Sequence, residues 1–237
     1  MTLLFRDDPY LRSCTAQVAG VGPKGIRLDR TVFYPAGGGQ PGDSGVLRLA
    51  DGRAVPIIDT VKGDGDEVWH VPAAEAGPPR HGDTVTAEID WDRRYRHMRM
   101  HTCLHLLCAV VPGEVTGGQI GDGKGRLDFN LPSVQLDKDH ITAELNRLIG
   151  EDHPVRPVWI TDDDLAARPD LVRTMSVKPP RGQGRVRVLE IEGVDLQPCG
   201  GTHVARTGEI GSVEVTKIES KGRQNRRVNL AFRSAAS

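Results

Sequence analysis

Residues 93–110 read RRYRHMRMHTCLHLLCAV, and this stretch decides how the chain is organised. Its length is typical of a helix, and Pro112-Gly113 predicts where that helix ends. Within it, His101 and His105 are four residues apart. Residues at this spacing lie one turn above each other on the same face, so both imidazoles can reach a single ion. The stretch therefore predicts half of a metal site on a helix.

The loop Cys199-Gly-Gly-Thr-His203 offers the other half of the site. Its two glycines permit a tight turn, so the Cys and His side chains can converge. Either half alone could serve packing, but both halves in one chain favour metal binding. Three imidazoles and one thiolate suit zinc. We therefore expect one zinc ion per chain, bound by His101, His105, Cys199 and His203.

Three more residues of the helix carry possible metal donors. His97 lies one turn before His101, but successive steps of four residues drift around a helix. We therefore expect His97 at the surface, or near the metal ligands without being one of them. Cys103 and Cys108 are expected to be buried as small apolar residues.

Strand and helix patterns divide the chain near residue 90. Before it, short segments separated by Gly and Pro predict a small antiparallel barrel or sandwich. These segments are residues 14–21, 26–33, 45–49, 53–61, 67–71 and 84–90. The second part is predicted to be α+β, with helices at 93–110 and 137–150 and a short capped helix after Thr161. Its predicted strands are residues 155–160, 185–191, 211–219 and 226–232.

Composition narrows the class of protein. The chain has 237 residues, of which 38% are hydrophobic and 27% are charged, as in globular proteins. A net charge of -1 excludes a global basic field, so any nucleic acid must be bound by local patches. The sequence has no apolar run of membrane-spanning length and no signal-peptide pattern. Four unevenly spaced cysteines do not resemble a disulfide framework, and we expect a cytoplasmic protein.

Five separated motifs resemble those of alanyl-tRNA editing domains, in the same order. His101-Thr-Cys-Leu-His105-Leu-Leu is similar to the HxxxH helix of the alanyl- and threonyl-tRNA synthetase editing domains. Residues 125–129, GRLDF, and 198–204, PCGGTHV, resemble the alanyl versions of the segments that follow. Residues 207–211, TGEIG, also resemble the alanyl group, and residues 31–45, TVFYPAGGGQPGDSG, resemble the Gly-rich motif of the barrel that precedes the editing domain.

The chain is thus similar to the freestanding alanyl-tRNA editing proteins of the longer AlaX type. The resemblance implies an N-terminal small antiparallel β-barrel at residues 1–90. It implies that residues 91–237 form a two-layer α+β editing domain of the threonyl/alanyl-tRNA synthetase second additional domain type. The expected activity is zinc-dependent trans-editing: deacylation of mischarged tRNA(Ala), chiefly Ser-tRNA(Ala), with Gly-tRNA(Ala) as a second candidate substrate.

The resemblance also suggests roles for two loops. It places Thr116 and Gln119 beside the amino acid pocket, where they would sense the substrate hydroxyl; loop capping is the simpler alternative. Gly37, Gly38, Gly39 and Gln40 would contact the 3′ end of the tRNA, because Gly-rich loops expose backbone N–H groups to polyanions. A plain hairpin turn is the alternative there. The chain departs from the alanyl pattern at Leu104, where many family members have Thr.

Basic residues cluster at the start of the 93–110 helix and near the C-terminus. They are either solvated or phosphate contacts, and they comprise Arg93, Arg94, Arg96, Arg99, Lys217, Lys221, Arg223, Arg226 and Arg227. Asp128 is expected either to support a metal ligand or to hydrogen-bond at the edge of the core.

The role of the metal stays open in the sequence. Four protein ligands fill a tetrahedral shell as in structural sites, whereas a catalytic site keeps one position open. Either His203 binds weakly, the zinc expands its shell, or the zinc is structural and the substrate's own ribose hydroxyl activates water. Two other classes of protein also fit: a zinc-stabilised tRNA-binding module without catalysis, and a zinc esterase of small substrates.

Overall fold

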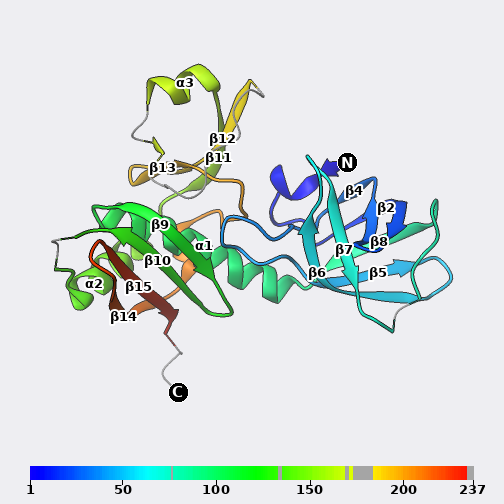
Figure 1. The fold of residues 1–237 in the computed structure, drawn as a ribbon, viewed down its shortest axis with the longest axis horizontal. Coiled ribbons are helices and arrows are strands. Elements are labelled where there is room, and N and C mark those ends of the chain that lie inside the picture. Colours follow the sequence, from blue (N-terminus) through cyan, green and yellow to red (C-terminus); the bar gives the residue numbers. More distant parts are fainter. Residues whose placement is uncertain (76, 133–134, 169–170, 173–183, 234–237) are drawn as a thin grey trace. The chain divides into compact units, whose positions relative to one another are not determined.

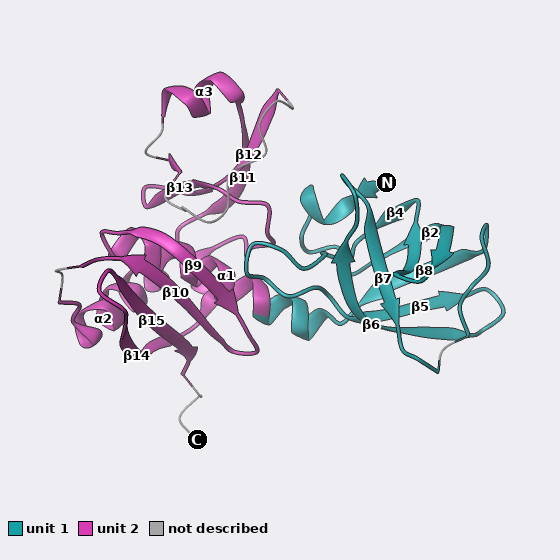
Figure 2. Ribbon diagram, viewed as in Figure 1, with its two compact units in different colours: residues 1–96 teal, residues 97–237 magenta. Residues whose placement is uncertain are grey.

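The computed structural model describes residues 1–75, 77–132, 135–168, 171–172 and 184–233 (Figure 1). The chain divides into two compact units, residues 1–96 and residues 97–237 (Figure 2). Helix α1 (Trp91–Val110) begins in the first unit and continues into the second. The division thus falls inside α1, whereas the sequence places the boundary at residues 90–91, where the helix starts.

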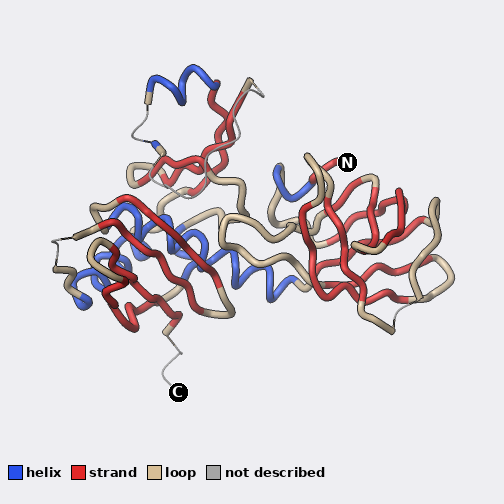
Figure 3. Tube along the Cα trace, viewed as in Figure 1, coloured by secondary structure: helices blue, strands red, loops and turns tan. Residues whose placement is uncertain are grey.

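The first unit contains a closed barrel of six antiparallel strands (Figure 3). Around the barrel the order is β2 (Ser13–Gly22), β3 (Gly25–Leu28), β7 (Val68–Pro72), β6 (Ala54–Lys62), β5 (Gly45–Leu49) and β8 (Thr84–Ile89). Side chains alternate along each strand, as in β6, where Val55 and Ile57 are buried and Pro56 and Ile58 are exposed. The barrel predicted for this part of the chain is confirmed.

Short elements and a buried ion pair complete the first unit. Strand β1 (Thr2–Leu3) pairs in parallel with β4 (Arg30–Thr31), and η1 (Leu4–Arg6) follows β1. Arg94, near the start of α1, is fully buried and forms an ion pair with Asp43, its Nε lying 2.9 Å from Oδ2. The same carboxylate accepts a hydrogen bond from the Tyr34 N–H. Arg94 is therefore a structural anchor, and the expectation of a solvated or phosphate-contacting Arg94 is wrong.

The second unit is α+β, as predicted, with two antiparallel sheets. One has the order β14 (Val213–Lys221), β15 (Asn225–Phe232), β10 (Lys124–Asn130) and β9 (Glu114–Ile120). The other contains β11 (Val155–Thr161), β12 (Arg185–Ile191) and β13 (Asp195–Pro198). The sequence analysis missed β9, β10 and β13. The described part of this unit also contains α2 (Lys138–Gly150), α3 (Asp162–Ala167) and η3 (Thr207–Ile210).

Helices α1 and α2 pack against the four-stranded sheet. On α2, the Thr142 hydroxyl accepts the Val215 N–H of β14. On β10, a Cβ added at Gly125 would lie 2.9 Å from Met100 and 3.4 Å from Leu104 of α1, so glycine permits close contact. Leu104 is 5% exposed and belongs to this core. The Leu104 side chain therefore packs against the sheet.

Candidate metal centre

The structure brings together the four residues that the sequence singles out as metal ligands. His101 and His105 project from one face of α1, and Cys199 and His203 come from the loop after β13. One donor atom from each residue lies within 4.8 Å of the other three. The Cys199 Sγ lies 3.6 Å from His101 Nε2 and 3.2 Å from His203 Nε2.

The two N–S separations are close to those around a tetrahedral zinc ion. With Zn–N bonds of about 2.0–2.1 Å and a Zn–S bond of about 2.3 Å, a tetrahedral angle sets N and S about 3.6 Å apart. The two observed N–S distances, 3.6 Å and 3.2 Å, lie within about half an ångström of this ideal distance. The three histidines are 3–7% exposed and Cys199 is half-buried, so protein surrounds most of the cluster. Donor chemistry and geometry both suit zinc.

A buried arginine shapes the loop that carries Cys199. Arg187 of β12 donates from Nη1 to the carbonyls of Cys199, at 2.7 Å, and Gly201, at 3.2 Å. The Gly201 N–H in turn points at the Cys199 Sγ, 3.4 Å away. These contacts hold the turn so that Cys199 and His203 face each other. The sequence analysis did not identify Arg187.

The electrostatics of the cluster favour the ligating forms of Cys199 and His203. Burial raises the pKa of the Cys199 thiol, but the charge of His101 and the hydrogen bonds with His101 and His105 outweigh it and hold the pKa well below its usual value. Burial, followed by the charge of His101, lowers the pKa of His203 well below its usual value. A thiolate and a neutral imidazole are the forms that bind zinc.

The pKa of His105 is determined by different neighbours from those of Cys199 and His203. Burial opposes its protonation, but hydrogen bonds with Asp195 and Cys199 raise its pKa to about 10. Its Nδ1 lies 3.3 Å from the Asp195 Oδ2, and Gln197 donates to the same oxygen at 2.8 Å. The sequence analysis missed Asp195 and Gln197, because neither forms a recognisable motif with the helix.

The other donors of α1 lie outside the metal cluster. His97 is 1% exposed, so the expectation of a surface position is wrong; α1 is enclosed on that face as well. Cys103 and Cys108 are buried, as expected. Burial raises the pKa of the Cys103 thiol to about 12, which makes it an inert apolar side chain.

Thr116 and Gln119 lie on β9. The Thr116 hydroxyl is 3.2 Å from the carbonyl of Asp128 and 3.3 Å from the Asn225 Oδ1. Gln119 is exposed, and its Oε1 accepts a hydrogen bond from Arg126 at 3.3 Å. Their role in sensing the substrate stays a prediction. Asp128 forms ion pairs with Arg126, at 2.9 Å, and with Arg227, at 2.7 Å.

The Gly-rich segment of the first unit forms a tight turn. Gly37 and Gln40 exchange two backbone hydrogen bonds of 3.0 Å, which leaves Gly38 (φ 58°) and Gly39 (φ 83°) at the tip. Positive φ at both central residues defines a type I′ turn. The two tip glycines are exposed, whereas Gln40 is 2% exposed. Contact of these four residues with tRNA stays a prediction.

One lysine lies against this turn. A Cβ added at Gly37 would be 2.6 Å from the Nζ of Lys62, so glycine leaves room for the ammonium group. Lys62 ends β6, and its side chain is exposed. The Tyr34 hydroxyl donates to the Gly37 carbonyl at 2.9 Å and helps to fix the turn. The sequence analysis did not single out Lys62.

Several of the clustered basic residues form contacts within the protein. Arg99 donates to the Ile210 carbonyl at 2.9 Å and lies 4.3 Å from the ring centroid of Phe232. Lys217 and Lys221 both pair with Glu219. The C-terminal cluster is thus partly neutralised by its own neighbours.

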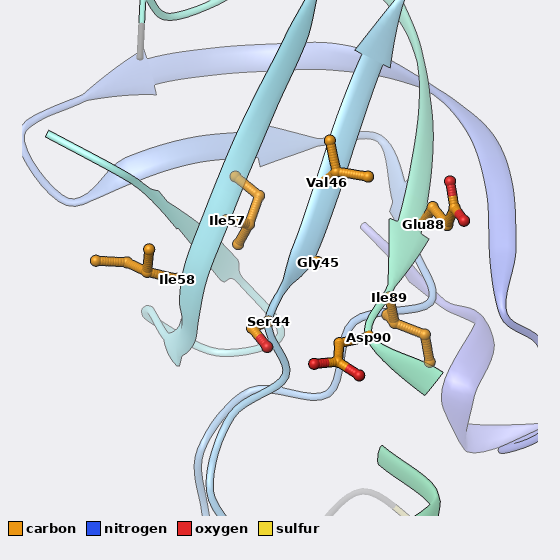
Figure 4. Close-up of a pocket in the computed structure, with 8 residues that line it drawn as sticks. All are labelled: Ser44, Gly45, Val46, Ile57, Ile58, Glu88, Ile89 and Asp90. Carbon is orange, nitrogen blue, oxygen red and sulfur yellow. The ribbon is translucent and has the colours of Figure 1, made fainter. Parts of the chain in front are cut away.

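The barrel surface carries a shallow hollow of about 510 Å³ (Figure 4). It is lined by Ser44, Gly45, Val46, Ile57, Ile58, Glu88, Ile89 and Asp90. The four metal-site residues are not among them. The charged residues of this lining are the acidic Glu88 and Asp90, and Glu88 is paired with Arg48 at 3.0 Å, so no lining residue offers a cation to an RNA phosphate.

The chain matches two family models. Residues 186–229 match the threonyl and alanyl tRNA synthetase second additional domain, which includes the loop of Cys199 and His203. Residues 9–93 match the class II (A) tRNA synthetases. In the described part of the chain, no helix is both long and apolar enough to cross a membrane.

Curated relatives align along nearly the whole chain. The alanyl-tRNA editing protein AlaX-M of Methanosarcina acetivorans is 39% identical over 236 residues, which cover 95% of this chain and 96% of that protein. AlaX-M of Saccharolobus solfataricus is 31% identical over 229 residues, with the same coverage. The alanine–tRNA ligase of Sulfurisphaera tokodaii is 36% identical over 225 residues, 91% of this chain but 24% of the ligase. The chain therefore belongs to the family of alanyl-tRNA editing proteins.

Proposed function

We propose that this protein is a zinc-dependent trans-editing deacylase that hydrolyses mischarged tRNA(Ala), chiefly Ser-tRNA(Ala), with Gly-tRNA(Ala) as a second substrate. The observation that carries the proposal is the cluster of His101, His105, Cys199 and His203 in a chain of the alanyl-tRNA editing family. Its relatives are named as alanyl-tRNA editing proteins and as alanine–tRNA ligases. Because tRNA is the substrate, we place the protein in the cytoplasm.

The reaction breaks the ester between the amino acid and the terminal ribose of the tRNA. A zinc ion held by the four donors would supply Lewis-acid chemistry at the ester carbonyl or at a water. The protein's own part is to position the ester. In the first unit, the exposed Gly38-Gly39 turn presents backbone to the 3′ end, and the neighbouring Lys62 offers a cation to its phosphates.

Selectivity must come from hydrogen bonding, because serine differs from alanine by one hydroxyl. A pocket that hydrogen-bonds this hydroxyl can reject the analogue without it by about 10⁴-fold, since its own polar groups would be left unpaired. We assign this sensing to Thr116 and Gln119. Replacing Thr116 with Val and Gln119 with Ala should therefore reduce the preference for Ser-tRNA(Ala) over Ala-tRNA(Ala).

The deciding experiment compares deacylation of tRNA(Ala) charged with Ser, Gly and Ala under identical conditions. We expect rapid hydrolysis of Ser-tRNA(Ala), slower hydrolysis of Gly-tRNA(Ala) and sparing of Ala-tRNA(Ala). Equal rates on the Ser and Ala substrates would overturn the proposal, because such an enzyme would destroy the correct product. Activity on simple serine esters at a similar rate would instead indicate a general zinc esterase.

One observation favours a second candidate, a zinc-stabilised tRNA-binding module without catalysis. Four protein donors around one ion, three of them on buried histidines, are typical of a structural zinc site rather than a catalytic one. In that case zinc-loaded protein would bind tRNA(Ala) but leave all three aminoacyl esters intact. The same assay, paired with a tRNA-binding measurement, separates the two candidates.

A further inference from the structure

Two of the candidate ligands have their second ring nitrogen held by a buried partner. For His105 this partner is Asp195, whose side chain is 1% exposed and whose Oδ2 lies 3.3 Å from Nδ1. Gln197 donates to the same carboxylate oxygen at 2.8 Å and orients it. A carboxylate accepts but does not donate, so the proton of His105 is held on Nδ1. Nε2 is then the nitrogen that remains for a metal.

For His203 the partner is the hydroxyl of Thr102, the residue that follows His101 on α1. Thr102 is fully buried, and its Oγ1 lies 3.2 Å from the Nδ1 of His203. The hydroxyl lies 3.0 Å from the Met98 carbonyl, which can only accept its proton, and its oxygen accepts the Val204 N–H at 3.3 Å. Toward His203 it therefore acts as an acceptor, which places that ring's proton on Nδ1 as well. The Nε2 of His203 then faces Cys199, 3.2 Å away.

We propose that Asp195 and Thr102 are positioning residues of the metal site, which hold His105 and His203 in the Nδ1–H form with Nε2 as the donor. His203 is then a full fourth ligand and not a weak one. The two partners differ in charge: the carboxylate strengthens His105 as a donor, whereas the neutral hydroxyl mainly orients His203. This inference rests on the proposed function, because it presupposes that the four-residue cluster binds zinc.

The test measures zinc affinity of the full chain by competition with a chromophoric chelator. Asp195→Asn keeps the shape but removes the charge, and Thr102→Val keeps the shape but removes the hydroxyl. Both should weaken zinc binding by about 10- to 100-fold, the usual cost of losing such a partner. Thr102→Ser, which keeps the hydroxyl, should bind zinc as the unmodified protein does. Glu192→Gln removes an equal charge from an exposed position just before β13, and it should leave the zinc affinity unchanged.

A second readout separates positioning from general loss of structure. The visible spectrum of the Co²⁺-loaded protein reports the ligands around the metal, and it should change in Thr102→Val but not in Thr102→Ser. The unfolding midpoint of the metal-free protein reports separately what each variant loses in stability, including the hydrogen bond that the Thr102 hydroxyl accepts from the Val204 N–H at 3.3 Å. If Asp195→Asn fails to fold, Gln197→Met leaves the charge but removes its orienting hydrogen bond, and it should weaken zinc binding by a smaller factor.

The outcomes distinguish this inference from the proposed function. Unchanged zinc affinity and Co²⁺ spectra in Asp195→Asn and Thr102→Val would overturn the positioning roles while the zinc site stands. Equal weakening in Thr102→Val and Thr102→Ser would overturn the role of the hydroxyl. Failure of the unmodified protein to bind either metal would instead overturn the zinc site itself.

Discussion

The barrel core contains a histidine whose burial makes stability depend on pH. His70 of β7 is fully buried; its Nδ1–H donates to the Ile26 carbonyl at 2.9 Å, and the Thr31 hydroxyl lies 2.8 Å from Nε2. The Phe33 N–H donates to the Thr31 oxygen at 3.0 Å, so the hydroxyl proton is available to His70. Both ring nitrogens are thus satisfied in the neutral form. Burial, opposed only by the hydrogen bond to Ile26, lowers the pKa of His70 from 6.5 to about 4.

The lowered pKa determines the sign and size of the effect. Below pH 6.5 the unfolded chain gains a proton on His70, whereas the folded protein takes one up only near pH 4. The free energy of unfolding therefore falls as the pH drops through this window. The complete loss is about 3 kcal/mol below pH 4, at about 1.4 kcal/mol per pKa unit. By pH 5.0 about 2 kcal/mol is lost relative to pH 7.5.

The assay compares the unmodified protein with His70→Gln by urea unfolding at pH 7.5 and pH 5.0. Between pH 7.5 and pH 5.0, the free energy of unfolding should fall by about 2 kcal/mol more in the unmodified protein than in the variant. His81→Gln, at an exposed position of the same unit, is the matched control and should follow the unmodified protein. If the difference in the free energy of unfolding between His70→Gln and the unmodified protein is the same at both pH values, the reasoning is refuted.

Three further predictions concern the metal, the RNA and the anchor of α1. Cys199→Ala should lower zinc content and deacylation together, whereas His97→Ala should retain zinc. Elemental analysis measures the zinc content of both proteins, and loss of zinc from His97→Ala would contradict the ligand assignment. Lys62→Gln should weaken tRNA binding and reduce the slope of log affinity against log salt by about 1, whereas Lys24→Gln, an exposed lysine of the same unit, should not. Arg94→Met leaves a buried carboxylate unpaired and should destabilise the protein by about 3–5 kcal/mol in denaturant unfolding, and a change below 1 kcal/mol would contradict the anchoring role.

Local spacing explains why the metal donors were predictable from the sequence. His101 and His105 are one helical turn apart, and Cys199 and His203 share one short loop, so each pair is visible without knowledge of the fold. The partners that shape the site have no such signal. Asp195 lies 90 residues from His105 along the chain, so only the folded structure reveals their contact.

The strand that was not predicted and the arginine that was expected at the surface each have a physical explanation. Strand β9 contains Gly117 and Gly118, and glycine is unfavourable in strands, so the segment resembles a loop; pairing with β10 on one side nevertheless makes it a strand. Arg94 stands in an arginine-rich stretch that resembles a solvated helix face. Its burial depends on Asp43, 51 residues away, and the sequence alone does not reveal that pair.

The turn at Gly38 and Gly39 has a consequence for protein chemistry. Both residues have positive φ, which L-amino acids adopt only under strain and D-amino acids adopt naturally. A Cβ added at Gly38 meets no atom within 4 Å, so handedness rather than size limits substitution there. D-alanine introduced by semisynthesis would preserve the shape of the turn and restrict the unfolded chain. L-alanine would distort the same turn, so the two mirror-image residues form a matched pair that separates the shape of the loop from its flexibility.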